Sequence, residues 1–301
     1  MQNRMSSLVV SLRGVLVFSL PAAAQIYFPG GTSDEQQKAA GESKAKLKYL
    51  PRDLSGIWRG GGPKVPQPKD PRIGDATPTW LMGNAPPPPM TAWGQKMFDT
   101  NKPSEINSWS SRRVVPALGN DPLGNCDPLG YPRNIQEPLG AGGGNVEFVQ
   151  TPDKILQIFD GGRRIREIWT DGRKLPEDLD QPRWYGWAVG HWEGDALIVD
   201  SKGYDERSWL DGNGWPHSEE MKLREVYRHP DAMTLEVTMT LDDPKAYTKT
   251  WVGNAQTFQL ALPKGLTVMY EYYCVPSEEQ AFNRGVRNPA GGDLENSRPL
   301  K

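Results

Sequence analysis

Short predicted β-strands separated by turn sequences fill residues 146–274 and constrain the fold more than any other feature. Turns are indicated by DGG at 160–162, TDG at 170–172, EGD at 193–195 and PKG at 263–265. We predict strands at 146–151, 154–160, 163–170, 184–192, 195–201, 219–229, 233–241, 246–260 (interrupted) and 265–274. Short connections favour antiparallel neighbours, and a long run of strands must close or fold over to hide its edges. The sequence predicts an all-β fold, an antiparallel meander of about eight or nine strands closed as a barrel, with a β-sandwich as the alternative.

The chain divides into five segments of different composition. They are a signal peptide at 1–24, a polar and partly disordered lead at 25–52, a first strand with a Pro- and Gly-rich wrapping arm at 53–145, the barrel at 146–274 and a flexible tail at 275–301. The arm is predicted to be extended, because 15 of the 28 prolines lie between Pro63 and Pro138. Within it we expect a short helix at 91–98, capped by Thr91.

The first residues indicate export. Arg4 and Arg13 precede an apolar stretch at 14–20, which is far shorter than a membrane span. Alanines at 22–24 follow and offer a cleavage site after Ala24. We therefore predict that the protein is periplasmic or secreted, with a buried N-terminal helix as the alternative for this stretch.

Composition and motif spacing argue against several classes of function. The net charge is −2 and no basic stripe is present, which argues against a nucleic-acid partner. No other apolar segment is long enough to form a membrane span. The histidines and cysteines lack metal-ligand spacing, and no glycine motif has a phosphate-binding context, so neither a metal nor a cofactor is expected. In an exported protein Cys126 and Cys274 are instead expected to form a disulfide, with two buried thiols as the alternative.

Alternation along the strands predicts which side chains face the barrel interior. At 233–241 every second residue is apolar, which indicates one buried face. The same analysis places Glu225 and Tyr227 inside on one strand and Glu167 inside on another. A buried carboxylate is costly unless it is paired or protonated, so both glutamates are candidates for acid–base chemistry or ligand binding. The alternative is a structural ion pair with a neighbouring arginine.

The candidate catalytic residues are Glu225, His217 and Asp211. His217 lies beside a loop rich in acidic and aromatic residues, where Asp211 could orient its imidazole and leave the other nitrogen as a base. The alternative for His217 is a rim histidine that caps a turn. The candidate ligand-binding residues, most of them aromatic, are expected to line a pocket for a small-molecule ligand. They are Glu167, Trp169, Tyr185, Trp187, His191, Trp209 and Tyr227.

Several sequence blocks together resemble those of a known family. They are DLSGIW at 53–58, NDP at 120–122 with CDP at 126–128, IWTDGR at 168–173, WEGDALIV at 192–199 and DDPKAY at 242–247. This combination is similar to that of a largely uncharacterised family of exported bacterial proteins with a lipocalin-like architecture. The resemblance implies a lipocalin-like barrel and assigns no chemistry. The matching positions are Trp169, Asp171, Arg173, Trp192, His217, Ser218, Glu225 and Cys274, and the chain departs from the family pattern at 275–277.

Three hypotheses for the function follow. The first is an exported barrel that binds a small, partly hydrophobic or aromatic molecule. The second is a cofactor-independent isomerase, lyase or hydrolase that uses acid–base chemistry on the same scaffold. The third is an interaction protein that uses the arm as a docking strap. A Glu225 side chain that is fully held by an arginine in a filled interior would count against catalysis, whereas an enclosed aromatic pocket would favour binding.

Overall fold

The structure is a computed structural model, and it describes most of the chain from residue 49 onwards. The described residues are 49–66, 69–73, 80–104, 112–115, 118–136, 145–160, 164–261, 269 and 274–275. Some predicted segments lie wholly or almost wholly outside this part of the chain. They are the signal peptide at 1–24, the lead at 25–52, the strand at 265–274 and the tail at 275–301.

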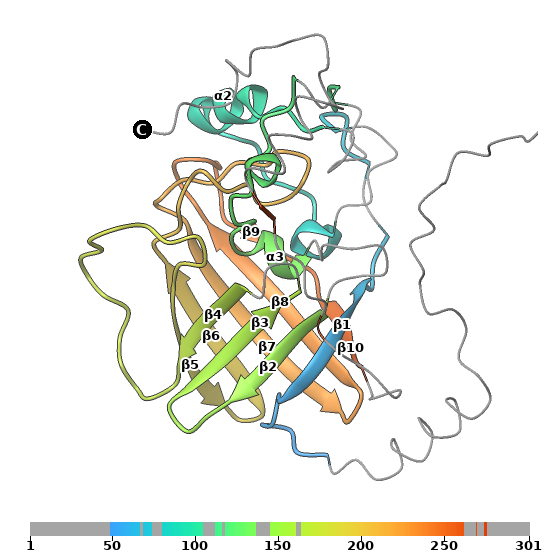
Figure 1. The fold of residues 1–301 in the computed structure, drawn as a ribbon, viewed down its shortest axis with the longest axis vertical. Coiled ribbons are helices and arrows are strands. Elements are labelled where there is room, and N and C mark those ends of the chain that lie inside the picture. Colours follow the sequence, from blue (N-terminus) through green and yellow to red (C-terminus); the bar gives the residue numbers. More distant parts are fainter. Residues whose placement is uncertain are drawn as a thin grey trace, which may run out of the picture.

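Nine strands form a closed barrel, which confirms the predicted all-β barrel over the alternative sandwich (Figure 1). The ring is closed because the last strand pairs with the first strand on one side and with β8 on the other. The barrel strands are β1 (Gly56–Pro63), β2 (Asn145–Gln150), β3 (Lys154–Phe159), β4 (Arg164–Trp169), β5 (Trp187–Glu193), β6 (Ala196–Lys202), β7 (Lys222–Asp231), β8 (Thr234–Asp242) and β10 (Gln256–Leu260). The short strand β9 (Trp251–Val252) pairs with β8 beyond the point where β10 leaves it.

The predicted meander is wrong at one connection, because β4 and β5 are parallel. All other neighbouring strands in the barrel are antiparallel. Nine strands in a closed ring cannot alternate direction at every step, so closure requires an odd number of parallel pairs. Residues 170–186 return the chain along the barrel before β5 begins, as a parallel connection requires.

The two ends of the barrel are closed in different ways. At the end where β3, β6 and β8 finish, the arm and the loop at 203–221 cover the opening (Figure 1); we call this the arm end. At the opposite end, which we call the far end, the ring of Trp58 is 1% exposed and packs edge-on against His229. Tyr49 lies on the other side of His229 and donates a hydrogen bond to its backbone carbonyl oxygen.

The arm contains short helices that cross the arm end. Helix α2 (Ala92–Thr100) confirms the predicted helix, and the Thr91 hydroxyl accepts a hydrogen bond from the backbone N–H of Gly94 at 3.1 Å. The arm also contains α3 (Arg133–Gln136) and the 3₁₀ helices η1 (Leu81–Asn84) and η3 (Pro122–Asn125). In the described part of the chain no helix is long and apolar enough to cross a membrane.

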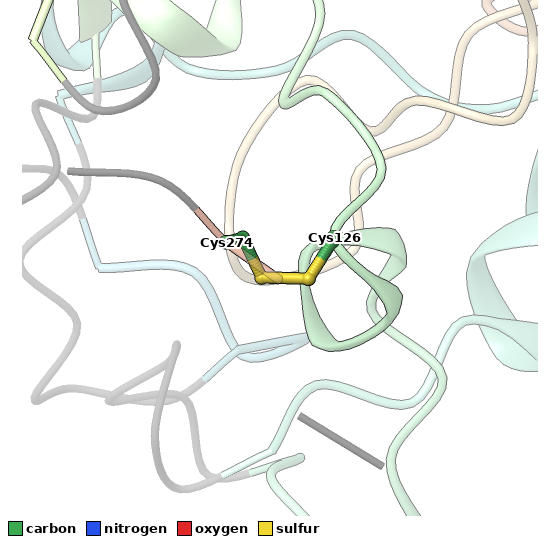
Figure 2. Close-up of a disulfide and its surroundings, with 2 residues drawn as sticks. All are labelled: Cys126 and Cys274. Atoms are coloured by element: carbon green, nitrogen blue, oxygen red, sulfur yellow. A yellow bond between two sulfur atoms is a disulfide. The ribbon is translucent and has the colours of Figure 1, made fainter. Parts of the chain in front are cut away.

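A disulfide between Cys126 and Cys274 confirms the predicted pairing (Figure 2). Cys126 follows η3 and lies five positions before Tyr131, the arm residue that enters the barrel interior. The bond therefore ties the arm to a position that lies 148 residues further along the chain, beyond the last barrel strand.

Replacing both cysteines with serine is expected to lower the free energy of unfolding by about 2–5 kcal/mol, because the unfolded chain regains the freedom of a very long loop. Urea unfolding followed by far-UV circular dichroism measures the change. Wild-type protein reduced with dithiothreitol serves as the control and should unfold at the same urea concentration as the double variant. An oxidised wild type no more stable than the double variant would contradict the prediction.

Candidate functional site: a buried polar network beneath the arm

Strand β7 places Glu225 inside the barrel, as its alternation predicted. Leu223, Glu225 and Tyr227 are all at most 1% exposed, and the residues between them face outward. The neighbouring strand β8 confirms the same pattern, since Leu235, Val237, Met239 and Leu241 are buried. On β7 and β8 the inward face is therefore largely apolar, and Glu225 is the carboxylate on it.

Strand β4 has the opposite orientation to the one predicted. Arg166 and Ile168 face the interior, whereas Ile165 is 54% exposed and Glu167 lies on the surface, where it pairs with Lys154 at 2.8 Å. The prediction that Glu167 points inward is wrong. The physical reason is charge pairing, because the inward orientation of β4 gives Glu225 a cation inside the barrel.

Arg166 and Glu225 form a fully buried ion pair. The Nη1 atom of Arg166 lies 2.9 and 2.8 Å from the two carboxylate oxygens, and the side chains are 1% and 0% exposed. The same nitrogen donates to the Gln157 side-chain oxygen at 3.0 Å, and Nη2 donates to the Ser201 hydroxyl at 3.2 Å. One guanidinium thus connects β4 with β3, β6 and β7.

Three tyrosines complete this network. The Tyr227 hydroxyl donates to Glu225 at 3.3 Å and accepts from the Gln157 amide at 2.9 Å. The Tyr131 hydroxyl lies 2.9 Å from that of Tyr227, and we infer that Tyr131 donates because the single Tyr227 proton is directed at Glu225. Tyr204 lies 2.5 Å from the Ser201 hydroxyl. We call this set the interior polar network; it comprises Tyr131, Gln157, Arg166, Ser201, Tyr204, Glu225 and Tyr227.

The network keeps its arginine charged and its phenols protonated. Burial is the largest single influence on the pKa of Arg166 and lowers it, but the charge of Glu225 and the neighbouring tyrosines together raise that pKa well above its usual value. Burial, reinforced by the charge of Glu225, raises the pKa of Tyr131 well above 10. Burial also raises the pKa of Tyr204 to about 12. The phenols are therefore hydrogen-bond donors at neutral pH, not proton acceptors.

Tyr131 is the contribution of the arm to the barrel interior. Its side chain is 1% exposed, and the guanidinium carbon of Arg166 lies 3.7 Å from the centre of its ring. Its backbone N–H donates to the carbonyl oxygen of Trp184 at 3.0 Å, which holds the arm against the connection to β5. The arm is thus part of the barrel core.

This arrangement weighs against Glu225 as a proton-transfer residue. Both of its oxygens face Arg166, and one also accepts from Tyr227. A catalytic acid or base needs an oxygen free to approach a substrate. Glu225 has instead the geometry of a structural ion pair, which was the alternative that the sequence left open.

Tyr185 lies at the rim of the arm end and differs from the other tyrosines. It stacks on Phe159, with ring centres 5.9 Å apart and planes 15° apart. Its hydroxyl is buried and has no hydrogen-bond partner in the described part of the protein. Burial raises the pKa of Tyr185, against the opposing influence of the nearby Arg164 charge, so the phenol stays protonated. A buried donor without an acceptor is unusual in a folded protein.

His217 is buried in the loop that covers the arm end and pairs with Ser208. The His217 Nε2 atom lies 2.8 Å from the Ser208 hydroxyl, and Nδ1 lies 3.1 Å from the backbone carbonyl oxygen of Ser218. The carbonyl can only accept, so we infer that Nδ1 carries the proton and that Nε2 accepts from Ser208. Burial lowers the pKa of His217, which favours the neutral ring that this arrangement needs.

Ser208 is the functional candidate that the sequence did not reveal. It lies nine positions before His217, and no motif marks such a spacing. Gly130 of the arm packs directly on it: a Cβ atom there would lie 2.6 Å from the Ser208 side chain. The Ser208 hydroxyl also lies 3.0 Å from the Asp205 carbonyl oxygen, so two acceptors compete for its single proton.

Asp211 does not orient His217 as proposed from the sequence. It is fully buried and accepts from the backbone N–H of Asn213 at 2.9 Å and of Trp215 at 3.4 Å. The orienting acceptor for His217 is the Ser218 carbonyl oxygen instead. Asp211 therefore stabilises the turn between His217 and Ser208, in the manner of an Asx turn.

The remaining candidate ligand residues do not converge on one place. Trp209 is buried at the arm end with Arg133 over its ring at 5.8 Å. Trp187 lies on the outer face of β5 under Arg183, with a buried ring N–H that has no partner among the described residues. Trp169 and His191 also lie on outer faces, where Trp169 is flanked by Lys154 and Arg173 and His191 pairs with Glu193 at 3.0 Å. Of the predicted ligand residues, Tyr227 is in the interior and Tyr185 is at its rim.

Comparison with known proteins assigns no family and no function to this chain. No protein-family model matches the chain, and a search of curated proteins finds no significantly similar sequence. Within the described residues, no group of three or more His, Cys, Asp or Glu side chains is arranged to hold a metal ion. Fold and site define the protein as a closed β-barrel with a charged, tyrosine-rich interior.

Single replacements at Arg166 or Glu225 are expected to cost about 3–5 kcal/mol of unfolding free energy, because each leaves one buried charge unpaired. The double variant Arg166→Met/Glu225→Leu should lose much less than the sum of the single variants. Urea unfolding of the four proteins gives the coupling energy.

The exposed pair Lys154 and Glu167, on the outer faces of β3 and β4, is the matched control for this cycle. Lys154→Met and Glu167→Leu should couple by about 0–1 kcal/mol. Equal coupling energies for the two pairs would contradict the structural role assigned to Arg166 and Glu225.

Proposed function

We propose that this protein is an exported barrel that binds a small, partly hydrophobic or aromatic molecule at the rim of the arm end. The observation that carries the proposal is Tyr185, an aromatic side chain whose buried hydroxyl has no partner among the described residues. It stacks on Phe159, which together with Tyr131 makes an aromatic wall beside the interior polar network. A bound molecule with a hydrogen-bond acceptor would satisfy the hydroxyl and stack on the rings.

Export is the second part of this proposal. The disulfide between Cys126 and Cys274 is of the kind that persists in oxidising compartments such as the periplasm or the extracellular space. The predicted signal peptide at 1–24 and the resemblance to exported bacterial proteins support the same location. We also propose that the barrel is lipocalin-like in architecture, as the resemblance in sequence implies.

Titration with the neutral fluorescent dye N-phenyl-1-naphthylamine tests the binding site. We expect one dye per protein, and Tyr185→Ala should weaken binding about three- to tenfold because a stacking partner is lost. Tyr49→Ala, the same substitution at the far end, is the control and should leave binding unchanged. A dye that binds both variants and the wild type equally would contradict the proposal.

Natural ligands can then be sought by displacement of the dye with a panel of aromatic and terpenoid metabolites, with the products analysed by mass. Displacement without a change in ligand mass supports a binding protein. Formation of a product would instead support the enzyme hypothesis.

A hydrolase is the second candidate function, and the Ser208–His217 pair is the observation that favours it. The 2.8 Å contact and the oriented imidazole resemble the arrangement of an activated nucleophile and its base. Both side chains are 1% exposed, so a substrate could reach them only if Gly130 and the arm moved aside. Because catalysis would require this movement, we consider the hydrolase function less well supported than the binding function.

If the hydrolase candidate holds, a fluorophosphonate probe should add its mass to Ser208 of the wild type, and Ser208→Ala should remove the labelling. Ser55→Ala, at an exposed serine of the far end, is the control and should stay labelled. Absence of labelling on the wild type would contradict the hydrolase candidate and leave the binding proposal intact.

The interaction hypothesis has less support. Val65, Val115 and Leu118 are exposed apolar residues of the arm. Isolated apolar side chains of this kind are normal on protein surfaces and do not by themselves indicate a docking strip.

A further inference from the structure

We infer that the ligand is an aromatic anion, a ring compound that carries a negatively charged oxyacid group such as a carboxylate or sulfonate, and that Arg164 binds the charge. This inference rests on the proposed function and adds the chemical class of the ligand. Its basis is the placement on one rim of the Arg164 guanidinium and the Tyr185 hydroxyl, neither of which has a partner among the described residues.

Arg164 lies at the start of β4 on the face that points inward. It shares that face with Arg166 and Ile168, which are buried, and it pairs across the sheet with Phe159. Its side chain is half-buried and has neither an ion pair nor a hydrogen bond in the described part of the protein. Phe159, the cross-strand partner of Arg164, also stacks on Tyr185, so the two groups lie in the same region of the rim. The charge of Arg164 accordingly opposes the rise in the pKa of Tyr185 that burial causes.

Unlike Arg164, the two fully buried arginines each have an acidic partner. Arg166 pairs with Glu225 inside the barrel, and Arg133 donates two hydrogen bonds to Asp121 at 2.8 and 2.7 Å within the arm. A cation that is removed from water is normally accompanied by an anion. At Arg164 a ligand could supply that anion.

The same position offers three kinds of contact to one molecule. Arg164 supplies a cation with several N–H donors, Tyr185 supplies a protonated hydroxyl, and the stacked Phe159 and Tyr185 rings supply an aromatic surface. An oxyacid group accepts hydrogen bonds from both donors, and an attached ring can pack on the aromatic surface. A neutral ring compound would leave the guanidinium unpaired.

The sheet is interrupted beside these residues. Strands β4 and β5 pair only at Ile168 with Ala188 and at Trp169 with Val189, both toward the far end. On the side facing β5, the first four residues of β4 therefore lack a strand partner among the described strands. Arg164 therefore lies beside an interruption in the strand pairing of the barrel wall, on the side where Tyr185 stacks on Phe159.

A matched pair of dyes tests the inference. 8-Anilinonaphthalene-1-sulfonate and N-phenyl-1-naphthylamine share the same rings, and only the first carries an anion. We expect Arg164→Gln to raise the Kd of the sulfonate about tenfold and to change the Kd of the neutral dye less than about twofold. Tyr185→Phe should also weaken the sulfonate selectively, because the stack is kept and the donor is lost.

Two control variants separate local from general effects. Arg164→Lys keeps the charge and should retain most of the sulfonate affinity, which shows that the site still folds when Arg164 is replaced. Arg173→Gln removes an exposed arginine that is paired with Asp171 and should change neither dye. Thermal unfolding by circular dichroism confirms that each variant is folded before titration.

The outcomes distinguish this inference from the proposed function. If both dyes bind at Tyr185 but Arg164→Gln leaves the sulfonate Kd unchanged, the anion inference is wrong and the binding proposal stands. Equal loss of sulfonate affinity in Arg164→Gln and Arg173→Gln would also overturn it, because the effect would then be general electrostatics. If Tyr185→Ala affects neither dye, the binding proposal and the inference both fail.

Discussion

The buried ion pair between Arg166 and Glu225 is the interaction on which the interior of the barrel depends. Two charges in an apolar core are tolerated when they meet each other and most of their remaining hydrogen-bonding atoms are satisfied, and here only Nε of Arg166 has no partner among the described residues. Glu225 on β7 therefore determines which face of β4 turns inward, since only that face supplies an arginine. Through Gln157 and Ser201 the same guanidinium also holds β3 and β6, so one side chain fixes the relative rotation of four strands.

Closure of the ring imposes a second constraint. With nine strands, at least one neighbouring pair has to run in the same direction, and the chain places this pair at β4 and β5. This arrangement requires a long connection at 170–186 between β4 and β5. It also leaves only two paired residues on each of these strands, and we call this weakly paired boundary the seam. The seam lies next to Arg164, so the topological requirement and the proposed binding position coincide on one side of the barrel. A barrel with an even number of strands could have closed without such a seam.

The sequence predicted the parts of the fold that are encoded locally and missed those that depend on distant partners. Strand β8 was predictable because apolar and polar residues alternate without exception, and burial follows that pattern. Strand β4 was not, because both of its faces carry apolar and charged residues and only the position of Glu225 decides between them. The Ser208–His217 contact could not be predicted for a related reason. A loop brings the two residues together, and no periodic pattern in the sequence indicates such a contact. The parallel pair could have been inferred only from a correct strand count, which local turn signals do not provide.

The position of Tyr131 determines where we place the proposed ligand site. A barrel that is open at one end would hold its ligand deep in the interior, but here the arm places a tyrosine ring on Arg166 and links its hydroxyl to Glu225 through Tyr227. The arm thus occupies the central polar position itself and braces the barrel, and the nearby disulfide at Cys126 limits how far it can withdraw. The proposed site therefore lies at the rim, where the Tyr185 hydroxyl and the Arg164 guanidinium lie next to the interrupted β4–β5 pairing, and for this reason we infer a small ligand that is ring-shaped at one end and anionic at the other.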